Sequence, residues 1–396
     1  MDRRKFLTLT GTFTGGSLLL PDFLYSFGSQ KNLIVGEQCI VFVQLNGGND
    51  GLNTFIPFED ALYYDVRPKI SLSKTEVLNS AKGMAFHPAL KGFASMQQSG
   101  DLSVIQNVGY PNPVRSHFRS QEIWQTAPTH QEYLSDGWLG RYLDLQCKEH
   151  QPTAGINIDS IDNLALKGEE PNSITVKDPD RFKTKSKAEN DGQLSDNPQL
   201  DFVRKVANSV VEGSDDIQKA LAKSAPSDVI YPKTGLAKNL EWISKLIKGN
   251  LNSKVYYTSL GGFDTHDNQL AIHKNKLTEL NDAVFSFDAM SKGFYEDLKK
   301  SQQLQNVTIV VFSEFGRRVK DNGRGTDHGT AAPMFVIGGN NRGKIIGNNP
   351  NLSDLDNGDL KHEIDFRSVY ASILKNKLAF DSSKIGIQNK ALEGLF

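Results

Sequence analysis

The chain has 396 residues, a length that allows one large domain or two ordinary ones. Its charge is balanced, with 45 Lys and Arg against 46 Asp and Glu, so the basic excess of a dedicated nucleic-acid binder is missing. Hydrophobic residues make up 38% of the chain and the mean hydropathy is −0.42, which excludes a multi-span membrane protein. Two cysteines cannot form a disulfide framework or a cysteine-rich zinc module.

The first residues have the form of an export signal. Arg3 and Arg4 precede a weakly apolar run that ends at Pro21, which is the order of a twin-arginine signal peptide. We expect residues 1–30 to be this signal and the twin-arginine export machinery to be a partner. The protein is then periplasmic or extracellular, with no membrane span after signal removal.

Short apolar runs rich in β-branched residues alternate with helical patterns after this segment. The runs are typical of strands buried on both faces, and the alternation predicts an α/β fold, a three-layer sandwich with a mostly parallel central sheet. The predicted strands are Cys39–Leu45, Leu102–Val108, Val255–Leu260, Val307–Phe312 and Met334–Ile337. The predicted helices are 87–98, 116–125, 139–148, 200–223, 235–248, 365–374 and one long apolar stripe over 268–300.

We expect one α/β domain over residues 38–380 and a C-terminal tail at 381–396. Residues 168–250 are predicted to be an insertion or cap, because their first part is rich in charged residues, Asn and Ser and poor in large apolar residues. Cys39 and Cys147 could pair in an oxidising compartment, but Cys39 opens a strand, which favours two small buried thiols.

Polar side chains follow several of the predicted strands. Ligands of open α/β sheets gather at the carboxyl ends of the strands, so carboxylates and imidazoles at these positions predict a metal site. The candidates are Asp50, Ser116, His117, Asp264, His266, Glu314, Arg317, Asp327 and His328, with His87 and His362 as further histidines.

Each candidate also has a structural interpretation. Ser116 can be a helix N-cap worth about 1 kcal/mol, and Asp264 or Asp267 can cap the helix that follows. A single Asp or His in a loop is usually structural. The placement of several such residues after separate strands is what favours a functional site.

Four motifs in chain order carry a resemblance to a known family. The strings GGNDGLNT, RSHF, GGFDTH and FSEFGR, followed by DHG, resemble the domain-of-unknown-function family 1501 over roughly residues 38–376. That family in turn resembles the alkaline phosphatase, sulfatase and cofactor-independent phosphoglycerate mutase superfamily. The resemblance implies an alkaline phosphatase-like α/β fold with two divalent metal ions, most often zinc or manganese, with calcium as the alternative found in sulfatases.

The resemblance also implies roles for the first candidates. Asp50 matches the aspartate that binds one metal after the first strand. Ser116 matches the nucleophile that opens the next helix. Asp264 and His266 match the ligands of the other metal, although one residue separates them here and the family has three.

The remaining ligands allow two alignments. In the first, Glu314 matches the carboxylate of an Asp-His motif whose histidine is missing, and Asp327 or His117 takes the vacant place. His328 is then the last ligand. In the second, Asp327 and His328 are themselves the Asp-His motif and His362 is the last ligand. The strand that leads directly into Glu314 favours the first.

The implied activity is that of an exported metal-dependent hydrolase of phosphate or related esters, acting on a small-molecule or polymer ester. Two metals would lower the pKa of the Ser116 hydroxyl, and Arg317, or alternatively Arg115 or Arg119, would hold the oxyanion. His117 is a second catalytic candidate beside Ser116.

Two other functions stay open. One is a non-catalytic exported protein on the same fold that binds a partner or a glycan. The other is a sulfatase-like hydrolase, which needs a modified residue at position 116. The residues two and four places after Ser116 are not the Pro and Arg that formylglycine formation requires.

Overall fold

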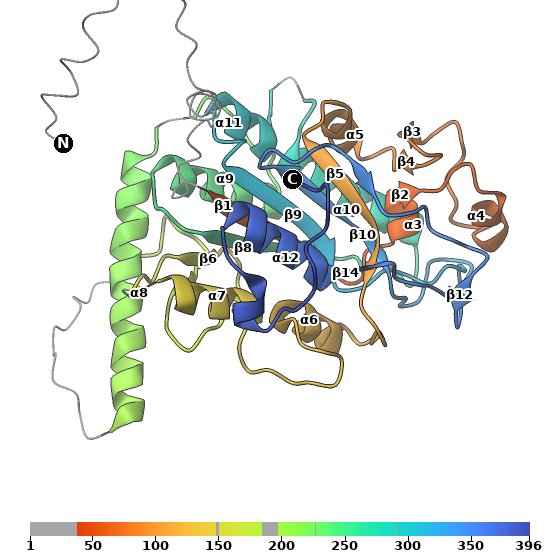
Figure 1. Ribbon diagram of the computed structural model, residues 1–396. Helices are drawn as coiled ribbons and strands as arrows, with labels where there is room; N and C mark the ends of the chain where they lie inside the picture. The colour runs from red at the N-terminus through yellow and green to blue at the C-terminus, as the bar shows by residue number, and fades with distance from the viewer. Residues whose placement is uncertain (1–37, 148–149, 184–196, 226, 289) are drawn as a thin grey trace, which may run out of the picture. The chain divides into compact units, whose positions relative to one another are not determined.

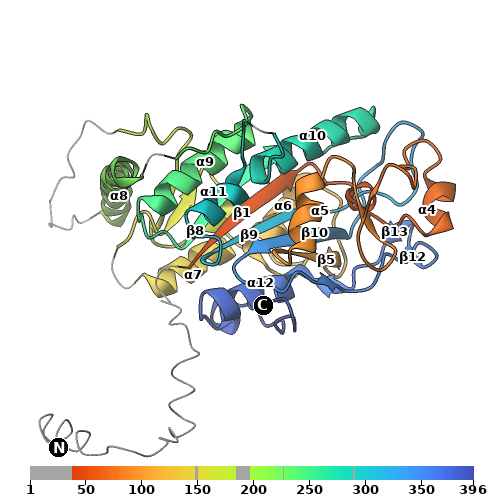
Figure 2. The same ribbon diagram turned by 90° about the horizontal axis from the view of Figure 1, so that it is seen from above.

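The computed structural model describes residues 38–147, 150–183, 197–225, 227–288 and 290–396, so the predicted signal at 1–30 lies outside the described residues. Contacts group Glu37–Phe396 into one unit. Figures 1 and 2 show a central sheet with helices on both of its faces. The predicted α/β sandwich of three layers is confirmed.

A nine-stranded sheet runs through the centre in the order β11-β5-β10-β9-β1-β8-β6-β7, with β14 also paired with β5. Only β10 runs antiparallel to its two neighbours, and the other pairs are parallel. The strands are β1 (Cys39–Asn46), β5 (Leu102–Gly109), β6 (Gly155–Asn157), β7 (Ser173–Thr175), β8 (Val255–Gly261), β9 (Val307–Ser313), β10 (Ala332–Gly338), β11 (Ile345–Ile346) and β14 (Ile364–Asp365).

Strand β1 shows why both faces of the sheet are covered. Val41, Val43 and Leu45 belong to one apolar cluster, whereas Ile40 and Phe42 belong to another. Successive side chains of a strand point to opposite faces, so an uninterrupted apolar run needs a helical layer on each side.

The helices divide between these two clusters, as Figure 2 shows from above. Those on the Val41 face are α5 (Lys91–Gln98), α8 (Pro198–Lys223), α9 (Gly235–Lys248), α10 (Gln269–Val284) and α11 (Phe294–Lys300). Those on the Phe42 face are α6 (His117–Thr126), α7 (Trp138–Gln146) and α12 (Phe366–Lys377).

The short elements lie beyond the main sheet. A three-stranded sheet joins β2 to β4 and β4 to β3, and β12 and β13 form a hairpin. Their bounds are β2 (Phe55–Ile56), β3 (Leu78–Asn79), β4 (Ala85–Phe86), β12 (Leu355–Asp356) and β13 (Asp359–Leu360). The short helices are α3 (Gly51–Thr54), α4 (Ala61–Val66), η1 (Leu164–Leu166) and η2 (Ser382–Ile385).

The region predicted as an insertion, 168–250, contains β7, α8 (Pro198–Lys223) and α9. Helix α8 is the long light-green helix at the β6–β7 end of the sheet in Figure 1, and α9 adds Leu240 and Ile243 to the core. The predicted tail at 381–396 also reaches the core, because Ile385, Ile387 and Leu395 are buried on the Phe42 face.

The single apolar stripe predicted over 268–300 is wrong in one respect, because the structure has two helices there. Helix α10 ends at Val284, and Phe285 is extended with φ −144° and ψ 113°. The chain then turns back so closely that a Cβ on Gly293 would lie 2.4 Å from the Val284 carbonyl. The apolar spacing runs across the break because both helices face the same cluster.

The structure also describes the two cysteines and the apolar character of the helices. Cys39 is a buried free thiol and Cys147 a half-buried one. Among the helices the structure describes, none combines the length and the apolar character needed to cross a membrane.

The strand order fixes where the polar loops meet. Strand β1 lies between β9 and β8 and is parallel to both, with Leu45 opposite Ser313 and Asn46 opposite Gly261. The loops after these three strands therefore start side by side at one edge of the sheet, which is where ligands of such sheets bind.

Candidate metal centre

The loops after β1 and β8 are packed against each other by a glycine. Gly47 has φ +120°, and a Cβ at this position would lie 2.4 Å from the backbone nitrogen of Asp264. A residue with a side chain would therefore push the two loops apart. The Gly47 N–H also donates to Glu314 Oε1 at 2.9 Å, which ties in the loop after β9.

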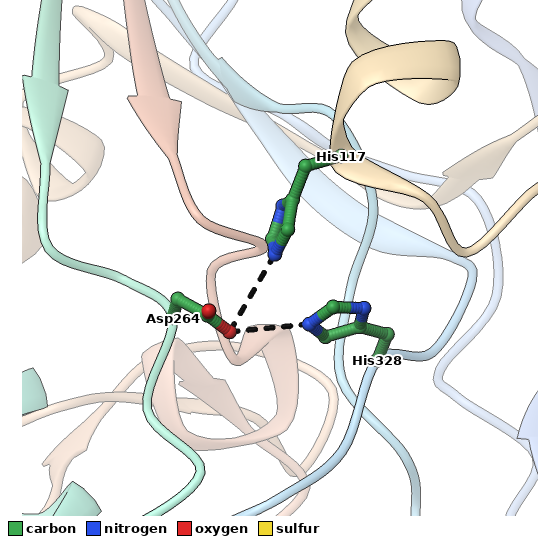
Figure 3. A group of neighbouring side chains, drawn as sticks. All are labelled: His117, Asp264 and His328. Atoms are coloured by element: carbon green, nitrogen blue, oxygen red, sulfur yellow. Dashed lines mark hydrogen bonds and ion pairs between the residues drawn. The ribbon is translucent and has the colours of Figure 1, made fainter.

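The possible ligand atoms of His117, Asp264 and His328 all lie within 4.8 Å of one another, and His266 contacts two of these three residues. Figure 3 shows His117 at the start of α6, Asp264 after β8 and His328 before β10. Asp264 Oδ1 lies 3.5 Å from His117 Nε2 and 3.1 Å from His328 Nε2. His266 Nε2 lies 3.0 Å from both Asp264 Oδ1 and His328 Nε2. The structure thus brings together four of the residues predicted from sequence.

The hydrogen bonds of the three rings decide which nitrogen carries the hydrogen. Carboxylates and backbone carbonyls only accept hydrogen bonds, so each ring must donate from Nδ1, and the neutral ring then has its lone pair on Nε2. The pairs are His117 with Glu314 Oε1 at 2.9 Å, His266 with Asp327 Oδ1 at 3.0 Å and His328 with the Arg115 carbonyl at 2.8 Å.

This donor set fits a metal ion. Zinc binds imidazole nitrogen and carboxylate oxygen at about 2.0–2.2 Å, so donor atoms around a tetrahedral ion lie about 3.3 Å apart. Asp264 Oδ1 lies 3.0–3.5 Å from the three Nε2 atoms, and the Nε2 atoms of His266 and His328 lie 3.0 Å apart. The Nε2 atom of His117 is moreover buried without a hydrogen-bond partner, as expected for a ligand atom.

Hydrogens on the Nε2 atoms cannot fully satisfy the close contacts between the histidine rings in place of a metal cation. At most one hydrogen fits between the Nε2 atoms of His266 and His328, which are 3.0 Å apart. The hydrogen bond to Glu314 raises the pKa of His117. Burial opposes ionisation of Asp264, but Arg317 outweighs it and lowers the pKa of this carboxyl to about 2. The Asp264 carboxylate is therefore ionised, and His117, whose raised pKa favours the imidazolium form without metal, would release a proton when its Nε2 binds a metal ion.

Glu314 and Asp327 lie behind the histidines, on their Nδ1 side. Glu314 is fully buried, and its Oε1 accepts from Gly47 and His117 while its Oε2 accepts from the Ser313 hydroxyl at 3.0 Å. Burial opposes its ionisation, but the hydrogen bond with His117 keeps its pKa below the usual range. Partners of this kind orient metal-binding histidines and increase their basicity.

Asp50 does not share this point in the structure. Its Oδ2 accepts from Arg67 Nη1 at 2.6 Å and from the Gln269 amide, and neither Asp50 nor Arg67 has exposed side-chain surface. Burial opposes its ionisation, but Arg67 outweighs this and lowers the pKa of Asp50. The position of Asp50 in the order of the motifs predicts a metal ligand. Nothing else in the sequence shows that Asp50 instead forms a buried ion pair with Arg67.

Arg317 holds the loops together from below. Its Nε donates to the Gly48 carbonyl at 2.7 Å, its Nη1 to the Thr326 carbonyl at 2.9 Å and its Nη2 to Asp264 Oδ1 at 2.6 Å. The side chain has no exposed surface. In this conformation Arg317 positions Asp264 and does not face a substrate.

Ser116 stands at the rim of the centre. It is the exposed N-cap residue of α6, and its hydroxyl does not cap the helix. The residues on its two sides both touch the cluster, because the Arg115 carbonyl accepts from His328 and the His117 ring approaches Asp264. Ser116 is therefore adjacent in the chain to two residues that contact the cluster, and its hydroxyl is not used to cap the helix.

The two further histidines lie elsewhere. His87 is buried beside His273, with ring centroids 5.9 Å apart, and burial lowers its pKa to about 3. His362 packs against Gly109 at the end of β5. Sequence reasoning missed Arg67 and Gln269, the partners of Asp50, because neither belongs to a motif.

Fold and site together define an α/β protein with a candidate metal centre at the carboxyl edge of a mostly parallel sheet. The model of the family described as "Protein of unknown function (DUF1501)" matches residues 103–385, and the chain belongs to this family. No curated protein sequence matches the chain.

Three solved structures are distantly similar to the chain. A phosphonate monoester hydrolase of Agrobacterium radiobacter has 8% identity over 91% of this chain and 79% of that chain, with a TM-score of 0.39. A sulfatase from Pseudoalteromonas sp. has 9% identity over 95% and 78%, with a TM-score of 0.40. The soluble domain of a lipooligosaccharide phosphoethanolamine transferase from Neisseria meningitidis has 10% identity over 87% and 89%, with a TM-score of 0.39. At TM-scores below 0.5 these likenesses say nothing about activity.

Asp50→Ala is expected to destabilise the metal-free protein by about 3–5 kcal/mol, because it leaves the buried Arg67 guanidinium unpaired. The measurement is urea unfolding in the presence of a chelator. The matched control is Asp60→Ala, which removes the cap of α4 and is expected to cost about 1 kcal/mol. If the metal-free Asp50→Ala protein is as stable as metal-free wild type, the ion-pair role is contradicted and Asp50 is again a candidate metal ligand.

Proposed function

We propose that the protein is an exported hydrolase of phosphate or related esters that uses one divalent transition-metal ion held by His117, Asp264, His266 and His328. The observation that carries the proposal is the convergence of three imidazole Nε2 atoms on one carboxylate oxygen, each ring fixed from behind at Nδ1. The ester class is supported by the resemblance of the motifs and by the position of Ser116 at a helix N-terminus.

The donors favour zinc or a similar transition metal. Imidazole suits such metals, whereas calcium prefers a shell made of oxygen ligands. A second ion has fewer donors than the sequence suggested, because Asp50 is paired with Arg67 and Glu314 with His117. A bound divalent ion supplies Lewis-acid chemistry, which polarises an ester and lowers the pKa of a nearby hydroxyl.

The chain's own residues then have separate tasks. Asp264 is oriented by Arg317, and the three rings are oriented by Glu314, Asp327 and the Arg115 carbonyl. Ser116 presents its hydroxyl as the nucleophile, and the N-terminus of α6 favours the negative charge of the ester beside it. The Ser116 oxygen would bond to the phosphorus or sulfur atom as the bond to the alcohol breaks, and the hydroxyl proton would leave with the alcohol. Water would then hydrolyse the new Ser116 ester, which releases the acid and restores the hydroxyl.

Purified wild-type protein is expected to contain about one transition-metal ion per chain, measured by elemental mass spectrometry. His328→Ala should lose the metal, because it removes a ligand. Glu314→Gln should keep the four donors but bind metal about 10–100-fold more weakly, because it removes the negative charge of the partner that orients His117. His130→Ala, at a histidine outside the cluster, is the control. Full metal content in His328→Ala would disprove the assigned ligand set.

Ser116→Ala is expected to keep its metal and to lose at least about a thousandfold in turnover of aryl phosphate, phosphonate or sulfate esters. Thr234→Ala is the matched control, because it removes the N-cap of α9 far from the centre and should cost only stability. Undiminished turnover by Ser116→Ala would exclude this nucleophile. If metal-loaded wild type cleaves none of these esters, the non-catalytic binding function is favoured instead.

We also propose export by the twin-arginine pathway, which is supported by Arg3 and Arg4 in the sequence. Replacing both with Lys is expected to retain the protein in the cytoplasm, as measured by cell fractionation. Arg181→Lys, an exposed arginine elsewhere in the chain, is the control. Unchanged export of the double variant would contradict a twin-arginine signal.

A further inference from the structure

Two partly exposed arginines flank one buried carboxylate next to the metal centre. Arg115 Nη2 is hydrogen-bonded to Asp359 Oδ2, and Arg318 Nε lies 3.5 Å from Asp359 Oδ1. The side chains of Arg115 and Arg318 are 38% and 31% exposed, whereas that of Asp359 is 1% exposed. The hairpin of β12 and β13 supplies Asp359, and Arg115 and Arg318 come from segments that hold the centre.

Both arginines are attached to the metal centre through the backbone. The Arg115 carbonyl accepts from His328 Nδ1 at 2.8 Å. The Arg318 N–H donates to the Asp327 carbonyl at 2.9 Å, and Arg317 on its N-terminal side forms an isolated bridge with His328. The backbone of both arginines therefore adjoins the His328 side of the centre.

The two guanidinium groups keep N–H groups that the described residues do not use. Asp359 lies between the two positive charges, its Oδ1 is buried without a hydrogen bond among the described residues, and Asp356 opposite it in the hairpin adds a second negative charge. Arg318 Nη1 donates to the Asn357 carbonyl, and Arg115 Nη2 donates to Asp359. The remaining N–H groups of these two partly exposed side chains have no hydrogen-bond partner among the described residues.

Three other arginines near the centre donate their hydrogen bonds within the protein and have little exposed surface. Arg317 and Arg67 are buried, and Arg119 is 11% exposed and bonded to Glu122 and to two backbone carbonyls. Arg115 and Arg318 therefore keep more exposed side-chain surface than Arg317, Arg67 and Arg119.

We propose that Arg115 and Arg318, held by Asp359, form an oxyanion subsite that takes a second phosphate or sulfate group of the substrate, apart from the ester that is cleaved. Guanidinium groups bind such oxyanions with paired, charge-assisted hydrogen bonds. The word substrate rests on the proposed hydrolase, whereas the binding of the anion does not require the metal.

The test titrates inorganic phosphate into the metal-free protein and follows it by calorimetry. Arg115→Met and Arg318→Met should each weaken phosphate binding at least about fivefold, because one unit charge at about 4 Å is worth this factor even in water. Arg181→Met is the control for the loss of a positive charge elsewhere.

Asp359→Asn separates binding from a structural role. Removal of the negative charge should tighten phosphate binding about fivefold, whereas a purely structural ion pair predicts weaker binding in this variant, as in the arginine variants. Thermal unfolding of each variant checks that it folds, and Arg318→Met keeps the test open if Arg115→Met does not. Phosphate binding that is absent in wild type, or unchanged in both arginine variants, would overturn the subsite.

Turnover distinguishes failure of the subsite from failure of the hydrolase. Wild type should cleave 4-sulfophenyl phosphate with a lower KM than phenyl phosphate at similar kcat, and Arg115→Met should remove this difference. An equal KM for the two esters in wild type would overturn the subsite. If neither ester is cleaved, the proposed hydrolase fails, and the phosphate titration still decides on the anion subsite by itself.

Discussion

The contact on which the rest of the site depends is the buried guanidinium of Arg317. It donates to the carbonyls of Gly48 and Thr326 and to Asp264 Oδ1, so a single side chain joins the loops that follow β1, β8 and β9. A buried charge is stable only when it is paired and its hydrogens are used, and this group meets both needs. Asp264 is thereby presented in one orientation, at the edge where three parallel strands end.

The histidines complete the centre because their Nδ1 atoms are all engaged elsewhere. Glu314 for His117, Asp327 for His266 and a backbone carbonyl for His328 leave three Nε2 lone pairs pointing at the same carboxylate oxygen. The Arg317 guanidinium already donates to this oxygen, and a metal ion would in addition satisfy the Nε2 lone pairs. The proposed metal site, nucleophile and anion subsite all follow from this arrangement, since Ser116 and Arg115 precede His117 in the same segment.

The sequence predicted the layers of the fold and the edge of the sheet that carries polar residues, because both follow from periodicity and from parallel strand order. It did not predict which of the candidate side chains lie close enough together to bind one metal ion. Glu314 and His117 are 197 residues apart, and whether Glu314 faces a metal or the back of a ring depends on side-chain direction, which strand-end position does not encode. Asp50 likewise has the sequence position of a metal ligand, and only the structure shows Arg67 beside it.

The most direct test of the account is a crystal structure of the zinc-loaded protein with anomalous diffraction at the zinc edge. The account predicts one strong anomalous peak at about 2.0–2.2 Å from the Nε2 atoms of His117, His266 and His328 and from an oxygen of Asp264. Glu314 should remain hydrogen-bonded to the ring of His117. A peak coordinated by Asp50 or Glu314, or no peak among the three histidines, would contradict it.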